Sequence, residues 1–168
     1  MTTTQRLDPK APMTIPLKER PRDWFFIVFF SFFVFSSFCS DAFHGLGMLD
    51  DTTFWGRANL WYGRLAGDDF LLADNAFARY STLVSGFIYG PFYLVLVYAF
   101  VRGKNFIRLP ALIYVGAMLH GWVEFMWWEY SLGTPPRVPF IFWAFYLPYG
   151  VVPVLLAIRM WKPEPFSS

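Results

Sequence analysis

Four long stretches that are almost free of charged residues limit what this chain can fold into. Each stretch has about the 20 apolar residues that a helix needs to cross a bilayer. Each is apolar on all sides, whereas a surface helix would be apolar along one stripe only. We therefore expect an all-α, polytopic membrane four-helix bundle, with spans at about residues 24–45, 80–101, 109–130 and 138–158.

The composition supports a membrane protein and argues against several other classes. The chain of 168 residues is 56% hydrophobic, 23% aromatic and 15% charged, and a soluble body of this size could not bury so much apolar surface. Its net charge of +2 is too small to hold a phosphate backbone, so no nucleic-acid partner is expected. The single cysteine, Cys39, excludes an internal disulfide. Two histidines are too few for a membrane di-iron site, and we expect no metal and no cofactor.

The charged residues predict the domain organisation and the orientation in the membrane. Residues 1–22 are polar and rich in proline, which predicts a flexible tail. Residues 23–161 form the membrane domain, and 162–168 form a second tail. Ten basic residues lie on the side of the two termini and four on the opposite side, so both termini are expected in the cytoplasm. We expect an integral membrane protein of the bacterial cytoplasmic membrane, or of the endoplasmic reticulum if the chain is eukaryotic.

The segment from 46 to 79, between the first two spans, is too long for an idle loop. It carries Trp55, Trp61 and Tyr62, and aromatic residues of this kind are typical of the membrane–water interface. We expect this segment to lie at the interface as a cap over one end of the bundle.

Ionisable residues inside two spans mark a candidate functional site, because such residues are costly in a bilayer. Asp41 and His44 lie on the first span, and His120, Glu124 and Glu129 lie on the third. At a rise of 1.5 Å per residue, Asp41 lies about 25 Å from the start of the first span and Glu124 about 22 Å from the start of the third. Both acids are therefore expected at a similar depth in the membrane. His120 and Glu124 share one helix face, whereas Glu129 points away from it. In a regular helix, the two glutamates cannot both face one narrow site.

These groups fit a reaction in which a proton enters and leaves a hydrocarbon. A carboxylic acid in an apolar site can protonate an alkene, and a second carboxylate or an imidazole can remove a proton from a neighbouring carbon. Aromatic faces would stabilise the carbocation between the two steps. The chain contains no phosphate loop, dinucleotide fingerprint, serine-hydrolase elbow or zinc-protease motif. The pattern therefore indicates an isomerase that shifts a double bond in a sterol or another isoprenoid.

Two other functions remain open from these residues. A buried carboxylate surrounded by aromatic rings also suits a non-catalytic receptor that binds a sterol, a lipid or a lipophilic amine. A proton-triggered terpenoid cyclase would need the same acid.

Five short motifs resemble those of a known family in their order and spacing. They are Leu60-Trp61-Tyr62, Ala66-Gly67-Asp68-Asp69, Gly90-Pro91, GKNFIRLPALIY at 103–114 and YLPYGVVP at 146–153. Together with the four-span layout, they resemble the emopamil-binding protein and sigma-2 receptor superfamily, the EXPERA domain, from about residue 24 to 161. The resemblance implies a helical bundle whose pocket opens to lipid. It also implies either a sterol Δ8–Δ7 isomerase or a sterol-binding protein.

The resemblance assigns positions to several acids. It places Asp41 at the first-helix acid of both branches, Asp69 at a loop acid of the sigma-2 branch, and Glu129 near the third-helix glutamate of the isomerase branch. The chain departs from the family elsewhere. Ser37 and Gly150 stand where the isomerase branch has histidine and asparagine. Ser85 stands where the sigma-2 branch has the glutamate that pairs with ligands, and the pair of His120 and Glu124 is particular to this chain. A related isomerase with another isoprenoid substrate is the interpretation that combines these features.

The predicted site therefore joins two spans. We expect Asp41 and either Glu124 or Glu129 to act as acid and base, assisted by His44 and His120. The expected partners are a hydrophobic small molecule and the lipid bilayer, and the sequence leaves open whether the chain forms a homodimer. The residues expected to contact the substrate are Ser37, Asp69, Tyr89, Trp122, Trp127, Trp128, Trp143, Tyr146 and Tyr149.

Overall fold

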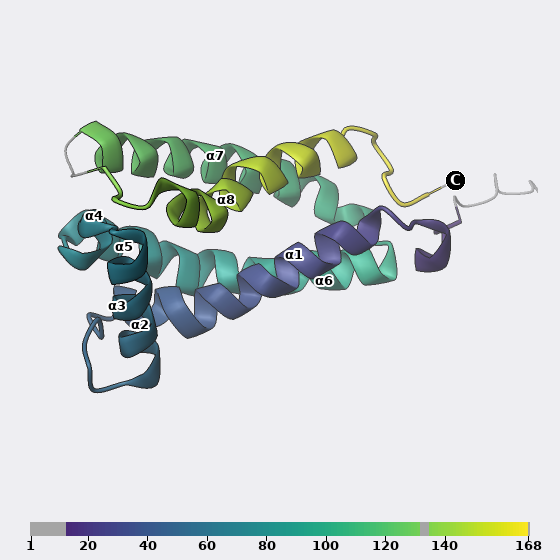
Figure 1. The fold of residues 1–168 in the computed structure, drawn as a ribbon. Coiled ribbons are helices and arrows are strands. Elements are labelled where there is room, and N and C mark those ends of the chain that lie inside the picture. Colours follow the sequence, from purple (N-terminus) through teal and green to yellow (C-terminus); the bar gives the residue numbers. More distant parts are fainter. Residues whose placement is uncertain (1–12, 132–134, 168) are drawn as a thin grey trace, which may run out of the picture.

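The computed structural model describes residues 13–131 and 135–167, and this part of the chain is helical apart from its turns and connecting segments. Four helices in it are long and apolar enough to cross a membrane (Figure 1), which confirms the predicted fold. Their boundaries lie within four residues of the expected ones. They cover Asp23–Gly45, Ala76–Arg102, Asn105–Ser131 and Pro139–Arg159.

The first two spans are composite helices, each with a π-helical turn in the described structure. A π-helical turn has one extra residue in its hydrogen-bonded ring, and such turns occur often at functional sites. The first span comprises α1 (Asp23–Ser36), η2 (Ser37–Asp41) and α2 (Ala42–Gly45). The second comprises α5 (Ala76–Val84), η3 (Ser85–Tyr89) and α6 (Gly90–Arg102). The third joins a 3-10 turn, η4 (Asn105–Ile107), to α7 (Arg108–Ser131), and the fourth is α8 (Pro139–Arg159).

The bundle consists of two helix pairs (Figure 1). α1 packs along α6, and α7 packs along α8. Aromatic residues fill the space between the pairs: the ring of Tyr93 lies 5.7 Å from Phe30 and 5.6 Å from Tyr114. The hydroxyl of Tyr114 donates a hydrogen bond to that of Tyr93 at 3.2 Å. This pairing satisfies two polar groups that would otherwise be costly to bury.

The segment expected to cap the bundle forms short helices across one of its ends (Figure 1). These are α3 (Phe54–Ala66), α4 (Asp69–Leu72) and the start of α5. Thr53, Asp68 and Asn75 precede them, and each side chain accepts a hydrogen bond from a backbone N–H in the first turn. Each therefore acts as an N-cap.

The described ends of the chain meet at the opposite end of the bundle (Figure 1). Residues 1–12 of the tail that we expected to be flexible lie outside the described residues. After them, Ile15 donates a backbone hydrogen bond to Phe166, and a 3-10 turn, η1, spans Leu17–Glu19. The buried carboxylate of Asp23 pairs with the guanidinium groups of Arg20 and Arg159. These contacts hold both ends against the spans, while the side of the membrane on which they lie stays a prediction.

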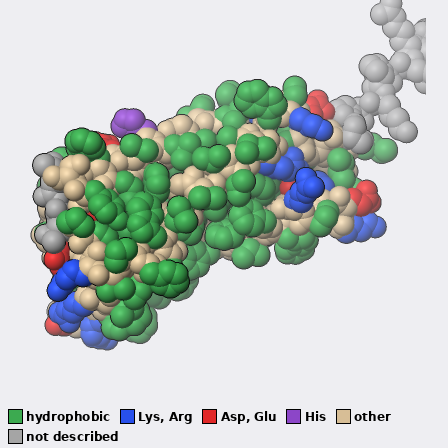
Figure 2. Space-filling model, turned by 45° about the horizontal axis from the view of Figure 1, so that its top comes forward, with side chains coloured by type: hydrophobic (Ala, Val, Ile, Leu, Met, Phe, Trp, Pro, Cys, Tyr) green, Lys and Arg blue, Asp and Glu red, His purple; other side chains and the backbone are tan. Residues whose placement is uncertain are grey.

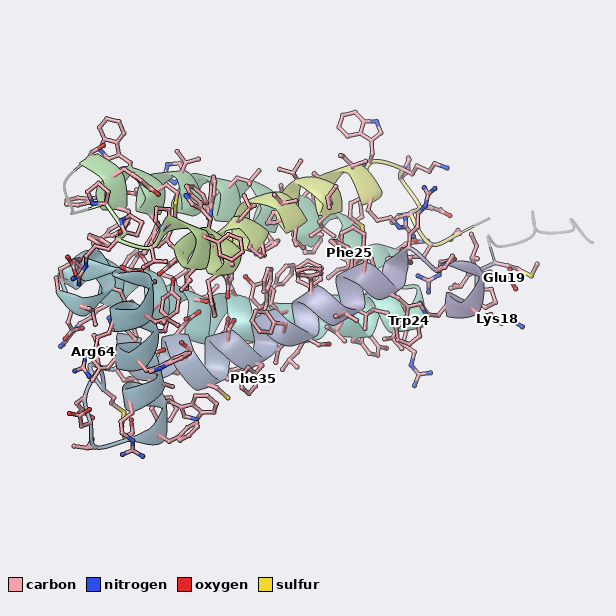
Figure 3. All side chains as sticks on the ribbon, in the orientation of Figure 1. Lys18, Glu19, Trp24, Phe25, Phe35 and Arg64 are labelled. Atoms are coloured by element: carbon pink, nitrogen blue, oxygen red, sulfur yellow. The ribbon has the colours of Figure 1, made fainter. Side chains whose placement is uncertain are left out.

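The surface has the distribution of a membrane protein. On the face seen in Figure 2, hydrophobic side chains cover most of the length, and charged groups gather at its two ends. Figure 3 shows Lys18 and Glu19 at one end, Arg64 on the cap at the other, and Trp24, Phe25 and Phe35 along α1 between them. These three side chains are exposed, as expected for groups that contact lipid tails.

Candidate functional site

A cavity of about 550 Å³ lies next to the cap, enclosed by parts of all four spans and by α3. Its volume is in the range of pockets that hold drug-sized ligands. The wall is mostly apolar and aromatic, which suits a hydrocarbon body. The aromatic side chains of the wall are Phe32, Phe35, Trp55, Trp61, Tyr62, Phe77, Tyr80, Tyr89, Trp122, Phe125, Phe145, Tyr146 and Tyr149.

Asp41 is the acid of this wall that is most firmly held. Its Oδ2 accepts a 2.6 Å hydrogen bond from the hydroxyl of Ser85. The hydroxyls of Ser85 and Ser37 lie 3.0 Å apart, and since Ser85 donates to Asp41, Ser37 donates to Ser85. The residues of this hydrogen-bond chain come from both π-helical turns. The other carboxylate oxygen of Asp41, Oδ1, has no hydrogen-bond partner among the described residues.

A close approach of the first two spans makes this contact geometry possible. A Cβ atom at Gly86 would lie 2.9 Å from both Cα and Cβ of Ala42, so the residue next to Ser85 must be glycine at this helix spacing. α3 is tied to the same place by Asn59, which exchanges two hydrogen bonds with Ser40 at 2.5 and 3.1 Å. The backbone around Asp41 is therefore fixed from two sides.

His44 also lines the cavity and is buried. Its Nε2 lies 3.2 Å from Oδ1 of Asp74, a residue in the turn before α5. Arg79 binds the same carboxylate. The hydrogen bond from Arg79 is the main reason why the pKa of Asp74 lies below its usual value. His44 and Asp41 are three residues apart on the first span, so they share one helix face.

His120 and Glu124 line the cavity at an open part of its rim. Their side chains are 82% and 48% exposed, and Nδ1 of His120 lies 3.9 Å from Oε2 of Glu124. A Cβ atom at Gly121, on the same part of α7, would have no neighbour within 4 Å. The open space over this part of α7 indicates that the pair forms part of the cavity entrance.

Glu129 lies apart from the cavity. Its side chain is buried, and neither carboxylate oxygen has a hydrogen-bond partner among the described residues. Asp68 is close enough to interact with it electrostatically, and Asp68 itself accepts hydrogen bonds from Leu71 N–H at 2.7 Å and from the Tyr146 hydroxyl at 3.0 Å. Burial raises the pKa of Asp68 above its usual value. Tyr146 belongs to the cavity wall, so it separates the cavity from this second group of acids.

Two aromatic side chains of the cavity wall, Trp122 and Tyr149, are held by specific contacts. Tyr149 stacks on Phe33 with a centroid distance of 4.4 Å and binds the Ser36 hydroxyl at 2.7 Å. The indole N–H of Trp122 donates to the carbonyl of Tyr146 at 2.9 Å. These bonds orient the rings, so the cavity has a defined shape before any ligand enters.

The structure brings eight of the predicted site residues to the cavity: Asp41, His44, Tyr89, His120, Trp122, Glu124, Tyr146 and Tyr149. Ser37 does not line the cavity. Its hydroxyl hydrogen-bonds to Ser85, which in turn donates to Asp41. The others lie elsewhere: Asp69 pairs with Arg137, Trp128 stacks on Phe77, Trp143 stacks on Tyr130, and Trp127 is 65% exposed. With Ser37 and Glu129, these make six predicted site residues outside the cavity wall.

Sequence reasoning missed several polar residues of the site. The sequence marks Ser85 only as a departure from the family pattern, and no sequence feature singles out Asn59. Asp74 precedes an asparagine that caps α5, and such an N-cap residue is a sequence signal for the start of a helix. It could have placed Asp74 near the end of the bundle, although not next to His44.

These features define an integral membrane protein with a ligand-sized cavity between its spans. A family model described as EXPERA (EXPanded EBP superfamily) matches residues 54–160, and the chain therefore belongs to the EXPERA family. The resemblance noted in the sequence is confirmed over this range. The match begins at α3, so Asp41 and His44 on the first span precede it. No curated protein matches the chain.

Proposed function

We propose that this protein is a membrane isomerase that moves a carbon–carbon double bond within a sterol or another isoprenoid. The observation that carries the proposal is the position of Asp41, which is held by Ser85 in the wall of a mostly aromatic cavity. The EXPERA family includes sterol isomerases, which supports the same reaction class.

Asp41 and His44 form the proton-transfer pair in this proposal. Asp41 in its acid form gives the proton on one oxygen to an alkene carbon, while Ser85 donates to the other oxygen. The new C–H bond leaves a carbocation, which the ring faces of the wall stabilise. His44 then takes a proton from a neighbouring carbon, whose C–H electron pair becomes the new double bond. The imidazolium then loses its proton to solvent and Asp41 takes one from solvent, so no proton is gained or lost over one cycle and the hydrogen added to the substrate comes from water.

The glutamates have other roles in this proposal. Glu124 is half exposed at the rim, where it and His120 meet the polar end of an amphipathic substrate, for example a hydroxyl group. Glu129 lies behind the wall that Tyr146 forms, which separates it from a bound hydrocarbon. For this reason we assign the base to His44, although the sequence favoured a glutamate.

A non-catalytic sterol-binding protein is the second candidate. It is favoured by the presence of Ser37 where the isomerase branch has a histidine. The two functions share the cavity and differ in what happens to the ligand.

The fate of the ligand separates the two candidates. Purified protein in detergent is incubated with a panel of Δ8-sterols and unsaturated terpenoids, and the recovered ligands are analysed by mass spectrometry and NMR. An isomerase returns a ligand with a shifted double bond. Saturable binding with unchanged ligand after long incubation would support the binding protein and overturn the proposal. Asp41→Asn should abolish turnover, while Trp127→Phe, on a side chain outside the cavity wall, should leave it unchanged.

A further inference from the structure

Asp74 connects the buried wall of the cavity to the surface. Its Oδ1 lies 3.2 Å from Nε2 of His44, whose side chain is almost fully buried, while Asp74 itself is 26% exposed. Both ring nitrogens of His44 are buried, and neither makes a hydrogen bond of regular geometry among the described residues; Nε2 is the one that lies within ion-pair distance of a carboxylate. The imidazole thus has a carboxylate on one side only.

The backbone of Asp74 is unusual. With φ of 48°, it is the one residue other than glycine in the left-handed region within the described ranges. Aspartate tolerates this region better than most residues, but the conformation still costs free energy. Such costs persist where the surrounding structure fixes them, and they concentrate at functional sites. Here the strained turn places the carboxylate against His44.

Arg79 fixes this carboxylate and keeps it charged. Its guanidinium binds both oxygens of Asp74 through Nε and an Nη, and the resulting decrease in the pKa of Asp74 favours the carboxylate over the acid. A carboxylate only accepts hydrogen bonds. A neutral imidazole that faces it therefore carries its proton on Nε2, which leaves Nδ1 unprotonated.

We propose that Asp74 is a positioning residue that fixes the tautomer of His44, with the proton on Nε2 and with Nδ1 free to accept a proton. The charged or titratable groups next to the imidazole are Asp74 and Arg79, together with Asp41 on the same helix face. This arrangement resembles the logic of a carboxylate that orients a catalytic histidine in a hydrolase. The role of His44 as base rests on the proposed function, but the tautomer does not.

The tautomer can be measured directly, because the chain contains only two histidines. In protein labelled with ¹⁵N-histidine, the nitrogen shifts distinguish protonated from unprotonated ring nitrogens. His120, which is 82% exposed, serves as the internal reference, and His120→Gln assigns its signals. We expect His44 to carry its proton on Nε2 in the unaltered protein.

Two variants at position 74 separate the carboxylate from the turn. Asp74→Gly keeps the left-handed backbone without strain but removes the acceptor, so His44 should become a mixture of tautomers. Asp74→Asn also tolerates the backbone, but its amide N–H₂ can donate to Nε2, so His44 should shift toward the tautomer with the proton on Nδ1. The signals of His120 should not move in either variant. A proton on Nδ1 of His44 in the unaltered protein, or a tautomer unaffected by Asp74→Gly, would overturn the proposal.

Turnover tests whether the tautomer matters for the reaction. With a substrate found as described above, Asp74→Gly should lower kcat about 10- to 100-fold, the usual effect of losing an orienting partner. KM should stay unchanged, and Asp74→Asn should lower kcat at least as much, because it favours the other tautomer. An unchanged kcat alongside an altered tautomer would overturn the positioning role. If the unaltered protein turns over no substrate, the proposed function fails, while the NMR result still decides the tautomer.

Discussion

At the residue scale, Asp68 shows how one carboxyl group can serve two structural roles at a cost. Asp68 caps α4 and accepts a hydrogen bond from the hydroxyl of Tyr146. Its side chain is nevertheless fully buried, and burial raises its pKa. A raised pKa in the folded state means that the folded protein binds a proton more tightly than the unfolded chain. Asp68 therefore favours folding at pH values below its unfolded pKa of about 3.9. This contribution is lost as the pH rises through the folded pKa.

Replacing Asp68 by Asn tests this pH dependence. The amide oxygen can still cap the helix and accept from Tyr146, but it has no charge to bury. Asp68→Asn should therefore be more stable than the unaltered protein at pH 7, and the difference should disappear near pH 3. Asp68→Ala, which loses the cap, should be less stable than Asp68→Asn by about 1 kcal/mol at both pH values. Thermal unfolding in detergent measures both. A difference between Asp68→Asn and the unaltered protein that does not depend on pH would contradict this account.

Glu124 is the residue at which proton transfer and substrate positioning are easiest to distinguish. If it holds a hydroxyl group at the rim, Glu124→Ala removes one hydrogen bond to a charged group, worth about 1.5–3 kcal/mol. The KM for a hydroxylated substrate should rise about tenfold or more, with little change in kcat. The methyl ether of that substrate should show a much smaller effect. A large loss of kcat at unchanged KM would instead make Glu124 part of the proton-transfer machinery.

At the element scale, the packing of η2 against η3 brings Asp41 and Ser85 together. Helical spans are readily predicted from hydropathy because every backbone group must be satisfied inside a bilayer. A π-helical turn depends on tertiary contacts that leave no periodic pattern in the sequence. The regular phase of a helix places Ser37, Asp41 and His44 on one part of the first span, but it gives no sign that Ser85 of the next span donates to Asp41.

Gly86→Ala should separate η3 from the start of α2. The added Cβ would overlap backbone and side-chain atoms of Ala42 at 2.9 Å, so the spans must move apart at a cost of about 1–3 kcal/mol. Gly116 provides the matched control, because a Cβ there would have no neighbour within 4 Å. Gly116→Ala should raise stability by about 0.5–1 kcal/mol through its higher helix propensity. Equal effects of the two substitutions on thermal unfolding would contradict the close packing of η3 against the start of α2.

At the scale of the whole molecule, an ion cluster closes the end of the bundle opposite the cavity. Arg159 donates to both oxygens of Asp23 at 2.7 and 3.0 Å, and Arg20 pairs with the same carboxylate. Both guanidinium groups also lie about 5 Å from the ring of Phe166. One acid thus joins the N-terminal segment, α8 and the C-terminal segment.

Asp23→Ala should therefore affect the entire protein. It leaves two arginines without their shared partner, and breaking a buried ion pair in this way costs about 3–5 kcal/mol. A lower unfolding temperature and faster proteolysis at both chain ends should follow. Glu19→Ala, a nearby exposed acid, should change neither. A normal unfolding temperature for Asp23→Ala would show that the cluster contributes little.

The overall architecture could be predicted from the sequence, whereas the inside of the site could not. Span number, helical class and the cap at 46–79 follow from hydropathy and from interface residues. The phase of a single helix could not reveal that Glu129 lies behind Tyr146, because this depends on how α7 packs against α8. Asp74 was missed for a similar reason, since only the folded turn brings it to His44.

Deuterium transfer from solvent tests the central claim most directly. A Δ8-sterol or related isoprenoid that the protein converts is incubated in D₂O, and the product is analysed by NMR and mass spectrometry. The account predicts one deuterium at the carbon that gains hydrogen, and no product with Asp41→Asn in protein that still folds. A product with a shifted double bond and no solvent deuterium, or full turnover by Asp41→Asn, would contradict proton transfer from Asp41.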